Sequence, residues 1–80
     1  MRERDIEKAY RKQVEARGGM CVKLSSQHFN GLPDRLIVLP ENEIYFVEFK
    51  SNTGKLSRRQ ERVISKLIAL GARVEVISEI

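Results

Sequence analysis

Two short apolar runs rich in β-branched and aromatic residues lie close together in the middle of the chain, at 35–39 (RLIVL) and 44–49 (IYFVEF). Only the four residues PENE separate them, and Pro40 and Asn42 in that segment are typical turn formers. A connection this short joins two antiparallel strands as a hairpin. The chain must therefore fold around a β-hairpin whose second strand carries a carboxylate, Glu48, among apolar neighbours.

The segments on either side of this hairpin alternate between helical and extended patterns. Apolar side chains recur at helical spacing over 3–17 and again over 57–70, and each stretch is followed by glycine. The runs MCVKL (20–24) and ARVEVIS (72–78) are typical of strands. The resulting order, α-β-β-β-α-β, predicts an α/β fold in which helices flank a mixed sheet, with residues 1–80 as one domain.

Composition sets broad limits on function. The chain has 80 residues, 41% of them hydrophobic and 32% charged, which suits a small folded domain. Its single cysteine excludes a disulfide framework and a cysteine-based metal site. No apolar run approaches the roughly 18 residues that a membrane span needs, so we expect a cytoplasmic protein without membrane contact. The formal charge of +4 favours an anionic partner such as nucleic acid.

Three charged residues of the hairpin region are expected to converge. Residues two apart on a strand face the same side, so Glu48 and Lys50 project together. Pro33 favours an extended backbone that places Asp34 at the start of the neighbouring strand, across from Glu48. Two carboxylates can hold Mg²⁺, and a nearby ammonium can orient the attacking water or neutralise a phosphate, which together suit phosphodiester hydrolysis. Turn formation by Asp34 and a solvated strand end are the structural alternatives.

The stretch GLPDRLIVLPENEIYFVEFK, followed by LSRRQ, resembles the VRR-NUC (virus-type replication-repair nuclease) family, a branch of the PD-(D/E)xK nucleases. The family signature is G-x-P-D, then E-x-K on the next strand, then a Gln that opens the following helix. Every position is matched, by Gly31, Pro33, Asp34, Glu48, Lys50 and Gln60.

This resemblance implies a restriction-endonuclease-like core and Mg²⁺- or Mn²⁺-dependent cleavage of branched DNA, with stand-alone phage and bacterial members similar to dimeric Holliday junction resolvases. It implies that Asp34 and Glu48 are metal ligands and that Lys50 is the catalytic lysine. It also implies a further metal ligand in the backbone carbonyl of Phe49. A homodimer is physically reasonable too, because a core this small gains from a partner subunit.

The family pattern includes a glutamate on the first helix, and two candidates lie there one turn apart. By helical geometry, Glu3 falls roughly 20° from the centre of the apolar stripe formed by Ile6, Tyr10 and Val14, and Glu7 falls about 60° from it. We therefore expect Glu3 to point inward as a metal ligand and Glu7, where the family usually has Gln, to lie at the edge. A frayed first turn with Glu3 in water is the alternative.

The start of the second helix combines polar and basic residues. Ser57 and Gln60 have the spacing of a capping box, yet Gln60 also lies where helix amides favour a phosphate, and both roles stay open. The basic residues nearby are expected to contact DNA phosphates, with a solvated helix face as the alternative. They are Lys55, Arg58, Arg59 and Arg62.

Two other functions remain open at this point. A DNA-binding module could keep the fold and the basic surface without cutting, although the intact Asp34, Glu48 and Lys50 argue against it. The domain could also be the nuclease subunit of a larger repair or replication assembly. His28 is expected to be a solvated loop residue rather than a general base, and Tyr10 a core residue rather than a platform for base stacking.

Overall fold

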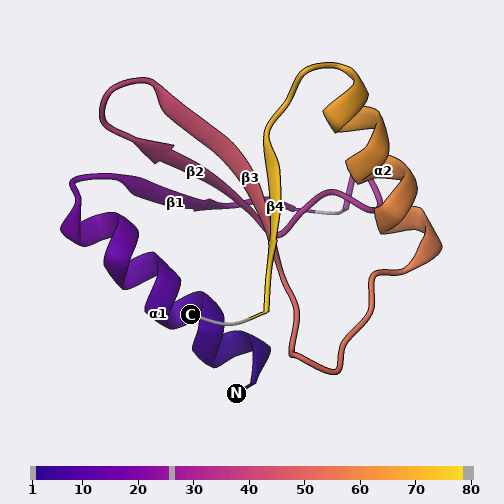
Figure 1. Ribbon diagram of the computed structural model, residues 1–80, viewed down its shortest axis with the longest axis horizontal. Coiled ribbons are helices and arrows are strands. Elements are labelled where there is room, and N and C mark those ends of the chain that lie inside the picture. Colours follow the sequence, from indigo (N-terminus) through magenta and orange to yellow (C-terminus); the bar gives the residue numbers. More distant parts are fainter. Residues whose placement is uncertain (1, 26, 79–80) are drawn as a thin grey trace.

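A computed structural model describes residues 2–25 and 27–78, so both ends of the predicted domain and Ser26 of the predicted loop lie outside the described residues. Two helices flank a four-stranded sheet (Figure 1). The predicted α/β class and element order are confirmed. The elements are α1 (Glu3–Ala16), β1 (Met20–Lys23), β2 (Arg35–Leu39), β3 (Glu43–Phe49), α2 (Arg58–Ala69) and β4 (Val74–Ile77). Among the described residues, neither helix has the length and apolar character of a membrane span.

The sheet is mixed and follows the order of the chain, β1-β2-β3-β4. Strands β2 and β3 form the predicted hairpin, and Glu41 and Asn42 in its turn have positive φ angles of 68° and 65°, in the left-handed region that tight turns use. Helix α2 then returns the chain so that β4 lies parallel to β3. Strand β3 therefore has a hydrogen-bonded neighbour on each side, which fixes the position of its side chains.

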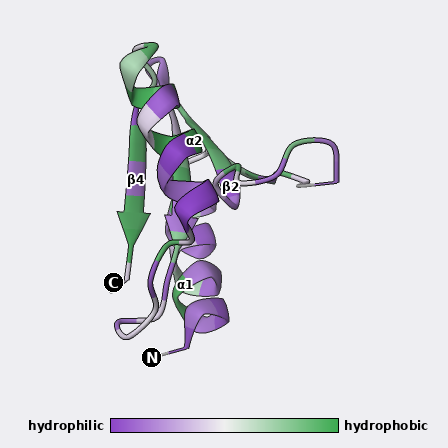
Figure 2. Ribbon diagram, turned by 90° about the vertical axis from the view of Figure 1, so that its right-hand side faces the viewer, coloured by the Kyte–Doolittle hydropathy of each residue, from purple (hydrophilic) through white to green (hydrophobic). Residues whose placement is uncertain are grey.

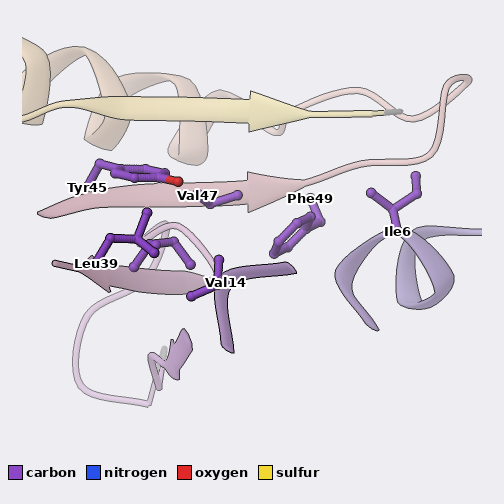
Figure 3. Packing of buried hydrophobic residues seen from close by; sticks show 7 residues of the cluster. Ile6, Val14, Leu39, Tyr45, Val47 and Phe49 are labelled. Atoms are coloured by element: carbon purple, nitrogen blue, oxygen red, sulfur yellow. The ribbon is translucent and has the colours of Figure 1, made fainter. Parts of the chain in front are cut away.

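One face of β3 forms the centre of the core. Its alternate residues Tyr45, Val47 and Phe49 are buried, and α1 packs on this face through Ile6 and Val14 (Figure 3). The contacts with α1 follow from the spacing of its apolar residues, which lie on one side of the helix. Burial of alternate residues on β3 leaves the intervening ones, including Glu48, on the opposite face of the sheet.

A hydrogen bond between two tyrosines, Tyr10 and Tyr45, links α1 to β3. The hydroxyl groups of Tyr10 and Tyr45 are 2.6 Å apart, and the Tyr10 ring meets Phe49 edge-on with 5.5 Å between ring centroids. Burial, followed by the hydrogen bond to Tyr45, raises the pKa of Tyr10. The Arg73 guanidinium covers the other ring of the pair, 3.9 Å from the centroid of Tyr45. The prediction that Tyr10 belongs to the core is confirmed.

The segment between β1 and β2 packs against α2 at a glycine. Gly31 has a φ angle of +89°, and a Cβ atom there would lie 2.9 Å from both Arg59 Cγ and Val63 Cγ2. The Arg59 side chain also donates a hydrogen bond to the carbonyl oxygen of Asn30, at 3.3 Å. This close approach brings Asp34, three residues later, toward the N-terminal end of α2.

Gly31→Ala should therefore destabilise the fold more than Gly71→Ala does. Both glycines have positive φ angles, but a Cβ atom at Gly71 would meet nothing within 4 Å. Both variants are expected to lose about 1–2 kcal/mol from backbone strain. Only Gly31→Ala also has to displace α2, which adds about 1–3 kcal/mol. Urea unfolding of the two variants measures the difference, and equal losses would show that the contact at Gly31 is not tight.

Candidate active site

The ends of β2 and β3 bring the predicted charged residues together. Because the two strands are antiparallel, Asp34, just before β2, lies beside the last residues of β3. Its Oδ2 atom accepts a hydrogen bond of 3.0 Å from the backbone N–H of Phe49. Lys50 Nζ lies 3.4 Å from Glu48 Oε2. Asp34, Glu48 and Lys50 thus form one cluster, as the hairpin and the two-residue period of the strand predict.

Glu48 is the most unusual member of this cluster, because its side chain is only 1% exposed. One oxygen, Oε2, accepts a hydrogen bond of 2.9 Å from Gln60 Nε2. The other oxygen, Oε1, is buried and has no hydrogen-bond partner among the described residues. Burial, and then the charge of Asp34, raises the pKa of Glu48, while Lys50 and Gln60 act in the opposite direction. A buried carboxylate with an oxygen left unsatisfied is costly unless a cation or another donor occupies the site.

The chemistry of this cluster fits a hard divalent cation. Mg²⁺ and Mn²⁺ prefer carboxylate, carbonyl and water oxygens, and Asp34 and the orphaned oxygen of Glu48 supply two of these. No group of three or more His, Cys, Asp or Glu residues within residues 2–25 and 27–78 is placed to hold a metal ion. Such an ion would rely on one or two carboxylates with water and substrate oxygens, which is the usual mode for Mg²⁺.

Phe49 lies between Glu48 and Lys50 in the chain, but its side chain is buried in the core on the other face of the sheet. Its backbone N–H binds Asp34, so the peptide unit before it helps to fix the cluster. The predicted role of its carbonyl oxygen as a metal ligand stays a prediction.

Gln60 joins α2 to the cluster with a single amide group. Its Oε1 accepts from the Ser57 backbone N–H at 3.0 Å, and its backbone N–H donates to Ser57 Oγ at 3.1 Å, so the predicted capping box is present. The same side chain donates from Nε2 to Glu48. The sequence indicated the first of these roles, whereas the contact with Glu48 depends on how α2 packs and was missed.

The two glutamates of α1 differ from the prediction in one respect. Glu3 is exposed, so its predicted inward orientation is wrong. The physical reason is that the first turn of α1 borders a hollow rather than the apolar core, and Glu3, Glu7 and Asp34 all line that hollow. Glu3 is therefore near Asp34 but in contact with solvent.

Glu7 forms an ion pair with Arg35, a residue that was not singled out from the sequence. Arg35 Nε donates to Glu7 Oε2 and Arg35 Nη2 donates to Glu7 Oε1, each at 3.1 Å. Both oxygens of Glu7 are thus engaged, and the hydrogen bonds with Glu7 raise the pKa of Arg35. The only signal in the sequence was an arginine directly after Asp34.

The predicted DNA-contacting residues are all exposed around the N-terminal end of α2. Arg59 and Gln60 line a hollow of about 480 Å³ together with Gly31, Asp34 and Ser57, so this part of α2 borders the carboxylate cluster. The remaining basic residues lie before and after it: Lys55, Arg58 and Arg62. His28 is exposed in its loop, as predicted.

The raised pKa of Glu48 makes a prediction for stability in the absence of metal. A carboxyl group whose pKa is raised by folding contributes stability below the ordinary pKa of a glutamate, and that contribution is lost as the pH rises through the raised value. Glu48→Gln cannot titrate, and its amide oxygen can still accept from Gln60. We expect Glu48→Gln to gain stability relative to the wild type as the pH increases from about 4 to about 7.

Urea unfolding in the presence of a chelator measures this difference, and Glu15→Gln, at an exposed position of α1, is the control. If the gain from Glu48→Gln did not depend on pH, the Glu48 carboxyl would have an ordinary pKa in the folded protein.

Comparison with known proteins connects this geometry to a family. A family model described as the VRR-NUC domain matches residues 1–78. A protein of Acyrthosiphon pisum secondary endosymbiont phage 1, named "Putative nuclease p44", is 40% identical over 77 residues, which cover 96% of this chain and 83% of that relative. A solved structure named "VRR_NUC domain" matches with a TM-score of 0.88 and 35% identity, over 96% of this chain and 84% of the other. The matches extend over nearly the whole chain.

Proposed function

The chain belongs to the VRR-NUC domain family, and on that premise we propose that it is a metal-dependent endonuclease that hydrolyses phosphodiester bonds in branched DNA. The observation that carries the proposal is the buried Glu48 carboxylate, whose free oxygen lies in a cluster with Asp34 and Lys50. A purely structural carboxylate would be expected to have both oxygens satisfied. The place of action would be the cytoplasm of a bacterium or of a phage-infected bacterium.

Each residue of the cluster has a distinct role in this proposal. Asp34 and Glu48 would hold Mg²⁺ or Mn²⁺ together with the Phe49 carbonyl, and the exposed carboxylate of Glu3, which lines a hollow with Asp34, would bind the ion through one of its water ligands. When bound, the cation supplies charge stabilisation at the phosphate and a more acidic water. Lys50 Nζ would hold the attacking water or a phosphate oxygen by hydrogen bonds, because an ammonium group only donates.

Gln60 has a positioning role beside this chemistry. Its hydrogen bond to Oε2 fixes the carboxylate plane of Glu48 and leaves Oε1 for the ligand. Since the same amide caps α2, the carboxylate and the basic end of that helix are held at a constant separation. A DNA backbone that contacts Arg58, Arg59 and Arg62 would then be presented to the cluster in one register.

The exposed apolar part of the sheet supports a homodimer. Met20, Val38 and Ile44 are cross-strand neighbours on the face that carries Glu48, and Met20 and Ile44 are 61% and 58% exposed. Side chains in this row are all apolar, so a second copy of the same face could cover them, whereas DNA could not. Two active sites related by a two-fold axis would suit a four-way junction.

The most direct test of the cluster is to remove its charges one at a time. Asp34→Asn and Glu48→Gln are each expected to reduce cleavage of four-way junction and flap DNA in Mg²⁺ or Mn²⁺ to the background level while DNA binding is kept. Lys50→Ala is expected to slow cleavage by roughly 10²–10⁴-fold, the range for loss of a group that handles protons or water. Linear duplex and metal-free reactions are the controls.

Thermal unfolding with added cation distinguishes the residues that bind the metal from Lys50, which does not. Saturating metal at about 100 times its dissociation constant should stabilise the wild type by about 2.7 kcal/mol. Lys50→Ala should keep this gain and the two carboxylate variants should lose it. Tight junction binding without cleavage in either ion would favour the DNA-binding module instead, and cleavage only after addition of other proteins would favour a subunit of a larger assembly.

Substitution of Glu3 is expected to lower mainly the cleavage rate, and substitution of Glu7 is expected to lower mainly the free energy of unfolding. Glu7→Gln leaves the Arg35 side chain, which is only 12% exposed, without its carboxylate, so we expect a loss of about 1–2 kcal/mol in unfolding free energy. Glu3→Gln should change stability by less than about 0.5 kcal/mol, since the residue is exposed. The single-turnover cleavage rate should fall much further in Glu3→Gln. A large rate loss in Glu7→Gln with a normal Glu3→Gln would transfer the metal-ligand role to Glu7.

A further inference from the structure

A second hollow, of about 460 Å³, adjoins the candidate active site along α2 and differs from it in chemistry. The two hollows share Leu32 and Arg59 in their walls. The rest of the second hollow is formed mainly by apolar side chains of α2 and by Phe29, from the loop before Gly31. We call this second hollow the apolar groove. A DNA strand held at the carboxylate cluster could pass over Arg59 directly into the apolar groove.

The apolar groove leaves large hydrophobic side chains in contact with solvent. Phe29 is 53% exposed and Leu70 is 73% exposed. Val63 and Leu67 continue the same wall between them. The C-terminal turn of α2 is correspondingly hydrophobic, in contrast to its polar first turns (Figure 2). A concave apolar surface of this kind commonly marks a site of binding.

The rim of the apolar groove is positively charged. Arg59, Arg62 and Lys66 border it and are exposed. An occupant must therefore combine a flat or apolar group with negative charge beside it. A nucleotide has both features, because its base can stack on an aromatic ring while its phosphates contact the cations.

Base pairing limits which nucleotides could enter. A base inside a duplex is covered by its neighbours on both faces, so only an unpaired or displaced base can present a face to Phe29. Such bases occur where the unpaired strand of a flap leaves the duplex, and a base pair next to the branch point of a junction can open to supply one. We propose that the apolar groove binds the unpaired base of a nucleotide that flanks the cleaved phosphate, with Phe29 as the stacking residue. The proposal rests on the nuclease function above and gives a reason for preferring branched DNA.

Equilibrium binding in an Asp34→Asn background tests the proposal without any dependence on cleavage. The probes are a flap with one unpaired base at the branch, the same flap with an abasic site at that position, and a fully paired duplex. Stacking of one base is worth about 1–3 kcal/mol, so Phe29→Ala should weaken binding of the first flap by roughly 5–150-fold. It should leave the abasic flap and the duplex unchanged, and Phe29→Tyr should restore the affinity.

Ile68→Ala is the matched control, because Ile68 has almost the same exposure, 54%, but does not line the apolar groove. An equal effect of Ile68→Ala, or an equal loss on all three probes, would overturn the proposal. Unchanged affinity of Phe29→Ala for every probe would also overturn it and would favour an acidic peptide as the occupant. Failure of the background protein to bind any DNA would instead reject the nuclease function itself.

Discussion

The hydrogen bond from Gln60 Nε2 to Glu48 Oε2 links helix α2 to the buried carboxylate of strand β3. On one side of it β3 and the core hold the carboxylate, and on the other side α2 holds the basic residues that we propose contact DNA. The Gln60 side chain also caps α2, so the helix cannot easily shift without disturbing Glu48. Gly31 also fixes the position of α2, because its lack of a side chain lets the loop before Asp34 pack closely on that helix. The separation between the carboxylate oxygens of the cluster and the basic side chains of α2 is therefore set by packing, in a chain of 80 residues.

The same arrangement is costly for stability. Glu48 is buried, its Oε1 atom has no hydrogen-bond partner within residues 2–25 and 27–78, and the negative charge of Asp34 further raises its pKa. Lys50 and Gln60 act in the opposite direction and lower the pKa of Glu48. Functional sites commonly retain such strain because a ligand relieves it. A chain that used this carboxylate only for structure would be expected to surround it with donors, as Arg35 surrounds Glu7.

The hairpin was predictable from the sequence because its signals are local. Period-two alternation on β3 and the turn residues at 40–43 place Asp34, Glu48 and Lys50 together without any knowledge of the rest. The orientation of Glu3 was not predictable from helical angle, since the angle specifies a direction and the neighbour found there is a hollow. The hydrogen bond between Gln60 and Glu48 was also not predictable from the sequence, because it depends on how α2 packs on the sheet. The apolar groove depends on the same placement together with the path of the loop at Phe29, so sequence patterns of single elements do not predict it.

The proposed nuclease site requires the free oxygen of Glu48 to be a metal ligand. The most direct measurement is a crystal structure of the wild-type protein with Mn²⁺, examined by anomalous scattering. We expect an anomalous peak between Asp34 and Glu48, at about 2.0–2.3 Å from Oε1 and without displacement of the Gln60 hydrogen bond. A structure at saturating Mn²⁺ in which Oε1 accepts its hydrogen bond from a protein group or an ordered water, with no peak beside it, would show that Glu48 is not a metal ligand.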